Sequence, residues 1–354
     1  MKKILFFPKY SEKGASSRYR IYSYIPFYER DNYDCSVKSL LDDWYLDAIW
    51  KKKSKLLLLP KLMMAYAKRI KDVLFVSKSQ IVYIGAELLP FFPCVFERYL
   101  KLRKVKFIIE FDDAVFHNYD NNKHWLVRKL YGRKFSKVIK MASAVICGCQ
   151  YLADYSRNWN DNVIIIPTSV DEEKYSVEHI DSNKLVVGWI GSPSSSRYIK
   201  EIIPSIIELQ KTINFELCLI GFDESYEYLL KGATYKLIKW NAEHEISELN
   251  KFSVGIMPLD DTPFSRGKCA FKLVQYMAIG IPTISTPLQS NVDIDKGCGN
   301  LFASSNKDWL RGLELLLKNQ NLRIDVGKRN KVVAHREYTF QRNYIKYENL
   351  FLSL

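Results

Sequence analysis

The stretch SRGKCAFKLVQYMAIGIPTISTP, from Ser265 to Pro287, carries the local signals of one helix and one strand in direct succession. Its start is basic, and an apolar helical pattern runs from Ala270 to Ala278. Gly280 is placed to end this helix, Pro282 prevents its continuation, and the β-branched residues that follow predict a strand. A helix that leads into a buried strand is typical of parallel α/β sheets.

Outward from this stretch, short apolar runs bounded by turns alternate with helical patterns along the chain. Such runs are typical of buried parallel strands. The ten runs are KILFFP, IVYIG, KFIIEF, AVICG, NVIIIP, LVVGWIG, FELCLIG, YKLIKW, VGIMPL and PTISTP. A polar stretch near residues 168 to 183 interrupts the series. The sequence therefore predicts an α/β fold of two doubly wound domains, with the first ending at residue 168.

Composition limits the classes of protein that fit. The 354 residues are 47% hydrophobic, enough for a large core in two domains. The formal net charge of +14 indicates an anionic partner, either nucleic acid, an anionic membrane surface or a phosphorylated substrate. Seven scattered cysteines form no paired framework, which predicts reduced thiols in a cytoplasmic protein. We expect the first residues to form a strand rather than a signal peptide, and no segment reaches the length of a membrane span.

Two loops of the second domain are candidate anion sites, because ligands of such sheets bind where strands end and helices begin. In the first loop, a strand ends at Gly191, a Ser-rich turn follows, and Arg197 and Lys200 lie close to a helix start. Backbone N–H groups, hydroxyls and a guanidinium would suit a diphosphate. The alternative is a Ser-capped helix with a solvated arginine.

The second loop is the start of the quoted stretch. Arg266, Lys268 and Lys272 cluster about the helix start, and Gln275 lies on the same face as Lys272. This arrangement would place a phosphate ligand next to a ligand for hydroxyl groups. An ordinary capped helix with solvated lysines is the alternative.

The first domain offers weaker signals. Gly14, in the turn GASSRYR, would permit close approach of a ligand, but on this signal alone a plain tight turn is the favoured interpretation. Glu110, Asp112 and Asp113 lie at the carboxyl end of a buried strand, where acids are costly unless they are paired or used. Asp113 would orient an acceptor or sugar hydroxyl, cap a helix, or help to hold a metal ion.

Other classes of site find little support in the sequence. The five histidines include no H-x3-H pair, and no G-x-S-x-G motif occurs. From the histidine spacing and the scarcity of clustered carboxylates we expect no metal cofactor. The aromatic residues follow the core pattern, so we do not expect nucleic acid as a partner.

The chain resembles the retaining GT-B glycosyltransferases of family 4 along nearly its whole length. The segments that carry the resemblance are GASSRYRIYSYIPF, EFDDAVF, IPTSVDEEKY, VGWIGSPSSSRYI, GIMPLDDTPFSRGKCAFKLVQYMAIGIPTIST and TFQRNYIKYENLF. The resemblance implies two Rossmann-like domains that face an interdomain cleft. It implies an acceptor domain at 1–168, a donor domain at 169–337, and a C-terminal helix, 338–354, that packs back on the first domain.

The resemblance also implies roles for particular residues. The family's diphosphate-binding Gly, Arg and Lys correspond to Gly191, Ser192 and Arg197, so one cation is missing. The two acids of the family's E-x7-E pattern fall on Gly267 and Gln275, so both acids are absent. Gln275 would still bind the ribose hydroxyls. The implied donor-binding residues are Gly14, Gly191, Ser192, Arg197, Lys268, Ala270, Phe271, Lys272 and Gln275, and the implied catalytic residues are Asp112, Asp113, Arg197 and Lys272.

The function that follows from the resemblance is metal-independent transfer of a sugar from a nucleotide-sugar, with retention, to a glycan or lipid-linked acceptor in surface polysaccharide synthesis. An epimerase of the same fold and a basic nucleic-acid binder are the alternatives. The segment from Trp50 to Lys71 has lysines on both sides of an apolar run, which favours an anionic membrane surface as a partner. A core helix with a basic rim is the alternative.

Overall fold

The computed structural model describes residues 2–50, 55–179 and 184–354. The chain forms two compact units. Unit 1 contains Met1–Thr168, Gly267–Cys269 and Asn343–Leu354, and unit 2 contains Ser169–Arg266 and Ala270–Arg342. One boundary between the units falls after Thr168, and the C-terminal helix passes from unit 2 to unit 1 within its own length. The grouping of Gly267–Cys269 with unit 1 has no signal in the sequence.

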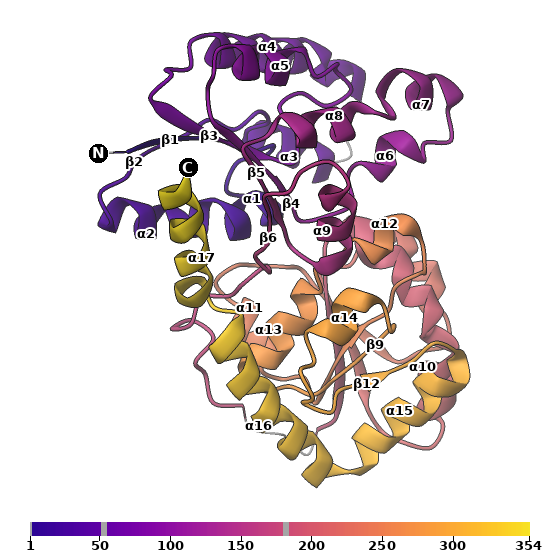
Figure 1. Ribbon diagram of the computed structural model, residues 1–354. Helices are drawn as coiled ribbons and strands as arrows, with labels where there is room; N and C mark the ends of the chain where they lie inside the picture. Colours follow the sequence, from indigo (N-terminus) through magenta and orange to yellow (C-terminus); the bar gives the residue numbers. More distant parts are fainter. Residues whose placement is uncertain (1, 51–54, 180–183) are drawn as a thin grey trace. The chain divides into compact units, whose positions relative to one another are not determined.

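Unit 1 is built on a parallel six-stranded sheet with the order β2-β1-β3-β4-β5-β6. Helices lie on both sides of this sheet (Figure 1). The strands are β1 (Lys3–Phe7), β2 (Asp34–Val37), β3 (Gln80–Gly85), β4 (Phe107–Phe111), β5 (Ala144–Cys147) and β6 (Val163–Ile165). The helices are α1 (Ala15–Arg20), η1 (Tyr22–Tyr24), α2 (Ile25–Arg30), α3 (Asp43–Trp50), α4 (Lys55–Leu74), α5 (Val95–Leu102), α6 (His117–Asp120), α7 (Trp125–Tyr131), α8 (Lys134–Met141) and α9 (Gln150–Arg157).

Unit 2 has a second parallel sheet of six strands, in the order β12-β11-β10-β7-β8-β9. Its strands are β7 (Val186–Ile190), β8 (Glu216–Ile220), β9 (Tyr235–Ile238), β10 (Val254–Met257), β11 (Thr283–Ser285) and β12 (Leu301–Phe302). Its helices are η2 (Pro193–Glu201), α10 (Ile203–Gln210), η3 (Glu224–Leu230), α11 (Glu245–Leu249), α12 (Pro263–Arg266), α13 (Phe271–Ile279), α14 (Gln289–Asp293), α15 (Asn306–Lys318) and α16 (Gln320–Glu337), and α17 (Phe340–Ser353) ends the chain.

All ten predicted strands are present, and all of them pair in parallel. The sequence missed β2 and β12. Strand β2 is an edge strand with the residues DCSV, none of which is buried, and β12 has only two residues. Neither strand has the continuous apolar run that marks a strand buried on both faces.

The helix of the quoted stretch is α13, and its predicted bounds were one residue too early. Ala270 precedes the helix in the left-handed conformation, with φ at 53°, and therefore cannot belong to it. Gly280 ends the helix as predicted, with φ at 99°. Gly280 also meets Gly327 of α16, where an added Cβ would lie 2.1 Å from the Gly280 carbonyl oxygen. This glycine pair lets the end of α13 pack closely on α16.

No helix in the described part of the chain combines the length and the apolar character needed to cross a membrane.

Candidate active site

The strand order of unit 2 defines where a ligand would bind its sheet. From β7 the chain adds β8 and β9 on one side, and then β10, β11 and β12 on the other. The order therefore reverses between β7 and β10. In open parallel sheets, ligands bind outside the carboxyl ends of the strands at such a switch point. The two loops there follow β7 and β10, and they are the two loops selected from the sequence.

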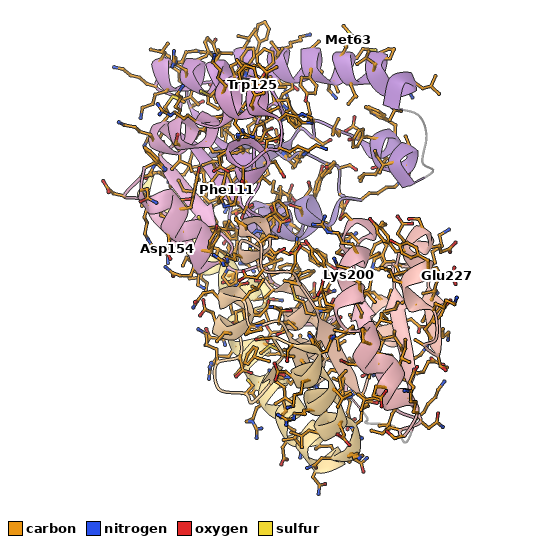
Figure 2. The ribbon with its side chains drawn as sticks, turned by 90° about the vertical axis from the view of Figure 1, so that its right-hand side faces the viewer. Met63, Phe111, Trp125, Asp154, Lys200 and Glu227 are labelled. Carbon is orange, nitrogen blue, oxygen red and sulfur yellow. The ribbon has the colours of Figure 1, made fainter. Side chains whose placement is uncertain are left out.

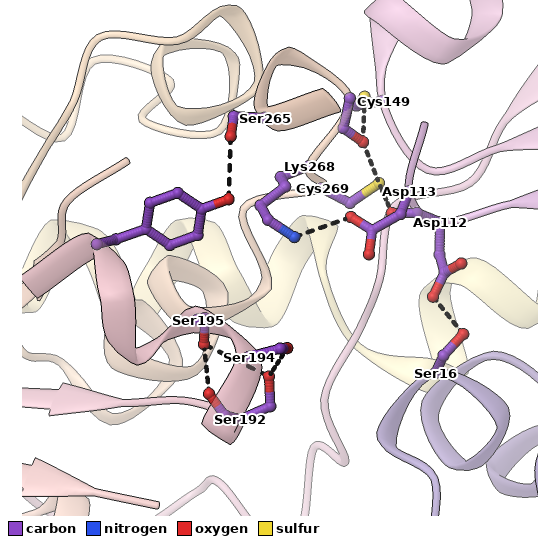
Figure 3. Close-up of polar contacts among 12 residues, drawn as sticks. Ser16, Asp112, Asp113, Cys149, Ser192, Ser194, Ser195, Ser265, Lys268 and Cys269 are labelled. Atoms are coloured by element: carbon purple, nitrogen blue, oxygen red, sulfur yellow. Dashed lines mark hydrogen bonds and ion pairs between the residues drawn. The ribbon is translucent and has the colours of Figure 1, made fainter. Parts of the chain in front are cut away.

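The loop after β7 requires glycine at its first position. A Cβ at Gly191 would lie 2.3 Å from the side chain of Trp189 and 2.8 Å from Ser195 Oγ. The backbone therefore passes directly over the indole ring. Beyond Gly191, the hydroxyl of Ser192 lies 3.0 Å from that of Ser194 and 3.4 Å from that of Ser195 (Figure 3). These hydroxyl groups lie at the N-cap and in the first turn of η2, a 3₁₀ helix rather than the α-helix typical of this position.

Arg197 projects from η2 and is exposed to solvent. Its Nη2 donates to the Tyr198 hydroxyl at 2.9 Å, and this hydrogen bond is the main cause that raises the pKa of Arg197. The Tyr198 hydroxyl also lies 3.2 Å from Ser265 Oγ (Figure 3). Ser265 Oγ in turn donates to Asp260. These contacts link the loop after β7 to the loop after β10. The sequence did not predict this link between Tyr198 and Ser265, because Tyr198 has the pattern of a core residue.

Lys272, in the first turn of α13, places its Nζ 5.5 Å from the centroid of the Trp189 ring. The same indole ring therefore lies against Gly191 and Lys272. Ala270, immediately before this helix, is buried and holds a conformation that is unfavourable for a non-glycine residue. Phe271 is half-buried next to it.

Gln275, the residue predicted to bind ribose, is buried in unit 2. Its Nε2 donates to the Tyr175 hydroxyl at 2.8 Å and lies 3.2 Å from Glu245 Oε1. Glu245 also accepts from Tyr175 at 2.9 Å and from Trp240 Nε1 at 2.6 Å. Sequence analysis missed Glu245, which places a carboxylate next to Gln275. The amide nitrogen of Gln275 is engaged by these partners, so Oε1 is the atom that would accept from a ligand hydroxyl.

In unit 1, the two acids after β4 have separate partners. Ser16 of α1 donates to Asp112, and Lys268 Nζ lies 3.2 Å from Asp113 Oδ1 (Figure 3). Cys269 Sγ lies 2.9 Å from the backbone oxygen of Asp112. The predicted residues Asp112, Asp113 and Lys268 therefore lie together. Gly14 lies two residues before Ser16, at the N-cap of α1, where an added Cβ would lie 2.6 Å from Tyr10 Cβ.

Gly267 lies in a space that admits no side chain. An added Cβ would lie 2.4 Å from Ala114 Cβ and 3.1 Å from Leu152 Cδ2. The first acid of the E-x7-E pattern falls on this position, so the contact gives a physical reason for its absence.

Glu110, the acid within β4 itself, belongs to a buried cluster that sequence analysis missed. Arg20 Nε donates to Glu110 Oε1 at 2.8 Å, and the Tyr347 hydroxyl donates to the same oxygen at 2.9 Å. Burial is the largest influence on Glu110 and raises its pKa, whereas the Arg20 guanidinium acts to lower it. The cluster ties α1, β4 and α17 together within unit 1. Arg20 belongs to the GASSRYR motif, but nothing in the sequence pairs it with Glu110.

Among the residues that the structure describes, no group of three or more His, Cys, Asp and Glu side chains could hold a metal ion.

No protein-family model matches this chain. An uncharacterised glycosyltransferase of Methanocaldococcus jannaschii is 23% identical to it over 266 residues. That match covers 70% of this chain and 65% of the archaeal protein, so the chain spans slightly less than two thirds of its relative.

Two solved structures are similar to this chain over almost their whole length. Sucrose-phosphate synthase of Thermosynechococcus elongatus has a TM-score of 0.74 and 10% identity, and the match covers 100% of this chain and 99% of that one. HepE of Anabaena, in complex with UDP and glucose, has a TM-score of 0.71 and 12% identity, with 100% of both chains covered. At these identities the likeness shows the fold. The chain has the GT-B fold, an α/β fold with two parallel six-stranded sheets.

Proposed function

We propose that this protein is a cytoplasmic glycosyltransferase of the retaining, metal-independent type. It would move a sugar, of hexosyl type, from a nucleotide-sugar to a glycan or lipid-linked acceptor in surface polysaccharide synthesis. The observation that carries the proposal is the switch point of unit 2. There Arg197 of η2 and Lys272 of α13 follow two loops that are joined through Tyr198 and Ser265. The GT-B fold shared with HepE, whose structure contains UDP and glucose, supports the same reading.

The diphosphate of the donor would lie against the loop after β7. Gly191 allows the phosphate to approach the backbone, and Ser192 supplies a hydroxyl in place of the family's arginine. Arg197 and Lys272 supply two positive charges. As the nucleoside diphosphate leaves, negative charge grows on its phosphate, and cations held in place beforehand stabilise that charge without reorganisation.

Retention would follow a front-face path, in which the leaving phosphate itself takes the proton of the acceptor hydroxyl. No dedicated general base is then required. Asp113, held by Lys268, and Asp112, held by Ser16, would orient hydroxyl groups of the sugar or the acceptor in this scheme. Gln275 would accept from a ribose hydroxyl through Oε1, with its amide orientation set by Glu245 and Tyr175.

A lipid-linked acceptor agrees with the segment from Trp50 to Lys71. Residues 51–54, which include three of its lysines, lie outside the described residues. From Lys55 onward, the segment belongs to α4. Its outward side exposes Leu57, Met63 and Met64, which a core helix with a basic rim would bury.

The proposal is tested with the purified protein and a panel of UDP-, GDP-, ADP- and CMP-sugars, read first by thermal shift. One class should raise the melting temperature, since a ligand at a hundred times its dissociation constant adds about 2.7 kcal/mol. Turnover of that donor should need an acceptor and should survive EDTA. Turnover without an acceptor would indicate the epimerase, and strict dependence on Mg²⁺ or Mn²⁺ would overturn the metal-free mechanism.

The roles of individual residues are tested by nucleoside diphosphate binding. Arg197→Ala and Lys272→Ala should each lose a charge-assisted hydrogen bond of roughly 1.5 to 3 kcal/mol, equivalent to about tenfold or more in affinity. Gln275→Leu should also weaken nucleotide binding. Lys200→Ala is the matched control, because Lys200 lies on the same helix but pairs with Glu201. Equal affinity of the Arg197, Lys272 and control variants would overturn this assignment of the site.

A further inference from the structure

Helix α7 is an unusual element of unit 1. Five of its seven residues, WLVRKLY, are apolar or aromatic, yet none of the seven, all of which the structure describes, is buried. Trp125, Leu126 and Leu130 are 59%, 52% and 68% exposed. Single exposed apolar residues are common on protein surfaces, but three on one short helix form a patch that indicates an interaction site.

The helix has a defined inner and outer side. Val127 and Tyr131, four residues apart, pack against the core of unit 1. This packing sets the rotation of the helix and directs the other side outward. Lys129 lies on that outer side, with its Nζ 5.6 Å from the Trp125 ring centroid. The outer side therefore combines an indole, two leucines and a cation.

The charge around α7 is strongly one-sided. Residues 121–153 contain seven Lys and Arg and no Asp or Glu. Residues 48–71, which include most of α4, contain eight Lys and Arg and again no acid. These two runs hold fifteen of the 53 basic residues, so the rest of the chain has 38 basic residues against 39 acidic ones. The whole net charge of +14 thus belongs to the two runs that contain the exposed helices.

Helix α4 has a similar outer side. Leu57, Met63 and Met64 are 75%, 67% and 72% exposed, and Lys61 and Lys68 are exposed among them. Within unit 1, α4 and α7 both lie toward the same end (Figure 1). In the view turned by 90°, Met63 of α4 and Trp125 of α7 are again toward that end, farther out than Phe111 (Figure 2).

We propose that α7, together with the outer side of α4, is a docking surface for an anionic lipid membrane. An acidic protein or a nucleic acid would account for the basic side chains. Neither partner requires that Trp125, Leu126 and Leu130 be exposed among those basic side chains. An interfacial helix uses both features. Its apolar side chains enter the boundary between headgroups and acyl chains, and its Lys and Arg side chains reach the lipid phosphates. Tryptophan is favoured at that boundary.

The proposal adds a second, independent contact to the one suggested for α4, and it does not involve the donor site. The experiment is co-sedimentation of the full chain with phosphatidylcholine vesicles, with and without phosphatidylglycerol. The variants are the triple change W125S/L126S/L130S and the charge change R128Q/K129Q. All five residues are exposed, so the fold should be kept, which melting curves verify. The matched controls in unit 2 are Y228S/V332S and K307Q/K328Q, which also change exposed residues.

We expect binding to the anionic vesicles only, and weaker binding at higher salt. R128Q/K129Q should weaken it by roughly fivefold per charge, and the triple change should reduce it at least as much, whereas both controls should bind like the wild type. Three outcomes would overturn the proposal: no binding to anionic vesicles at low salt, equal losses in variants and controls, or unchanged binding of the triple variant. Salt-sensitive oligonucleotide binding that depends on Arg128 and Lys129, without vesicle binding, would point to nucleic acid instead. Nucleoside diphosphate affinity should be unchanged in every α7 variant, so failure here leaves the proposed transferase activity untouched.

Discussion

Gly267 shows how a single residue limits the chemistry of the site. The family resemblance predicts an acid at this position, but a Cβ alone would already lie 2.4 Å from Ala114 Cβ. The adjacent Lys268 pairs with Asp113 instead. In unit 2, the carboxylate next to Gln275 belongs to Glu245 of α11. Within each unit, the acid beside the residue of the E-x7-E pattern therefore comes from another element.

We predict that Gly267→Ala destabilises the protein by about 1 to 3 kcal/mol, because it overpacks the contact with Ala114. Removing the opposing methyl group should restore space, so the double variant A114G/G267A should recover part of the loss. The check is the midpoint of urea unfolding for the wild type and the three variants. Purely additive losses in the double variant would contradict the steric account.

At the scale of elements, the cluster of Arg20, Glu110 and Tyr347 joins two ends of the sequence within unit 1. Arg20 and Glu110 are buried almost completely, and the Tyr347 hydroxyl comes from the last helix of the chain. A buried ion pair adds little stability compared with apolar residues, but a lone buried charge is strongly unfavourable. We therefore expect the cluster to favour one position of α17 in unit 1 over other positions, rather than to add much stability.

Arg20→Met should cost about 3 to 5 kcal/mol, because it leaves the Glu110 carboxylate buried without its cation. The double variant R20M/E110Q should be more stable than R20M, since it removes both charges and keeps an acceptor for Tyr347. Thermal unfolding of wild type, both single variants and the double variant gives the coupling between the two residues. If the double variant is no more stable than R20M, the ion pair does not explain the cost.

The sequence predicts elements whose signal is local. Ten strands could be recognised because each is an apolar run, and Gly280 could be recognised because a helix that ends there needs a left-handed residue. Three features depend on contacts between distant residues and could not be recognised: the pairing of Arg20 with Glu110, the link from Tyr198 to Ser265, and the position of Glu245 against Gln275. No local pattern records which side chains meet after folding.

Local signals in the sequence also selected the residues of the candidate site, but they did not show which other side chains lie around them. Gly191 and Lys272 were selected because each lies where a strand ends or a helix begins. Their shared neighbour, Trp189, was not selected, because a tryptophan in a buried strand looks like core. Yet the Trp189 ring contacts both, and it fixes how closely the backbone passes at Gly191.

At the scale of the whole molecule, the excess of basic residues and the proposed diphosphate site fall in different parts of the sequence. The positive charge lies in residues 48–71 and 121–153 of unit 1, while the remainder of the chain is almost neutral. The proposed binding of a diphosphate in unit 2 therefore depends on the positions of Arg197 and Lys272, and not on a general excess of basic residues. Salt should weaken vesicle binding far more than nucleotide binding, because interactions at an exposed surface are screened most.

The central claim is that a nucleoside diphosphate binds unit 2 at the switch point between β7 and β10. The measurement that tests it most directly is hydrogen exchange of the intact protein with and without UDP, the nucleotide found with HepE, or with another nucleoside diphosphate if the sugar-nucleotide panel selects its class. We predict slower exchange in residues 191–202 and 263–276, and loss of that protection in Arg197→Ala. Protection confined to other segments, or no saturable binding of any nucleoside diphosphate, would contradict the account.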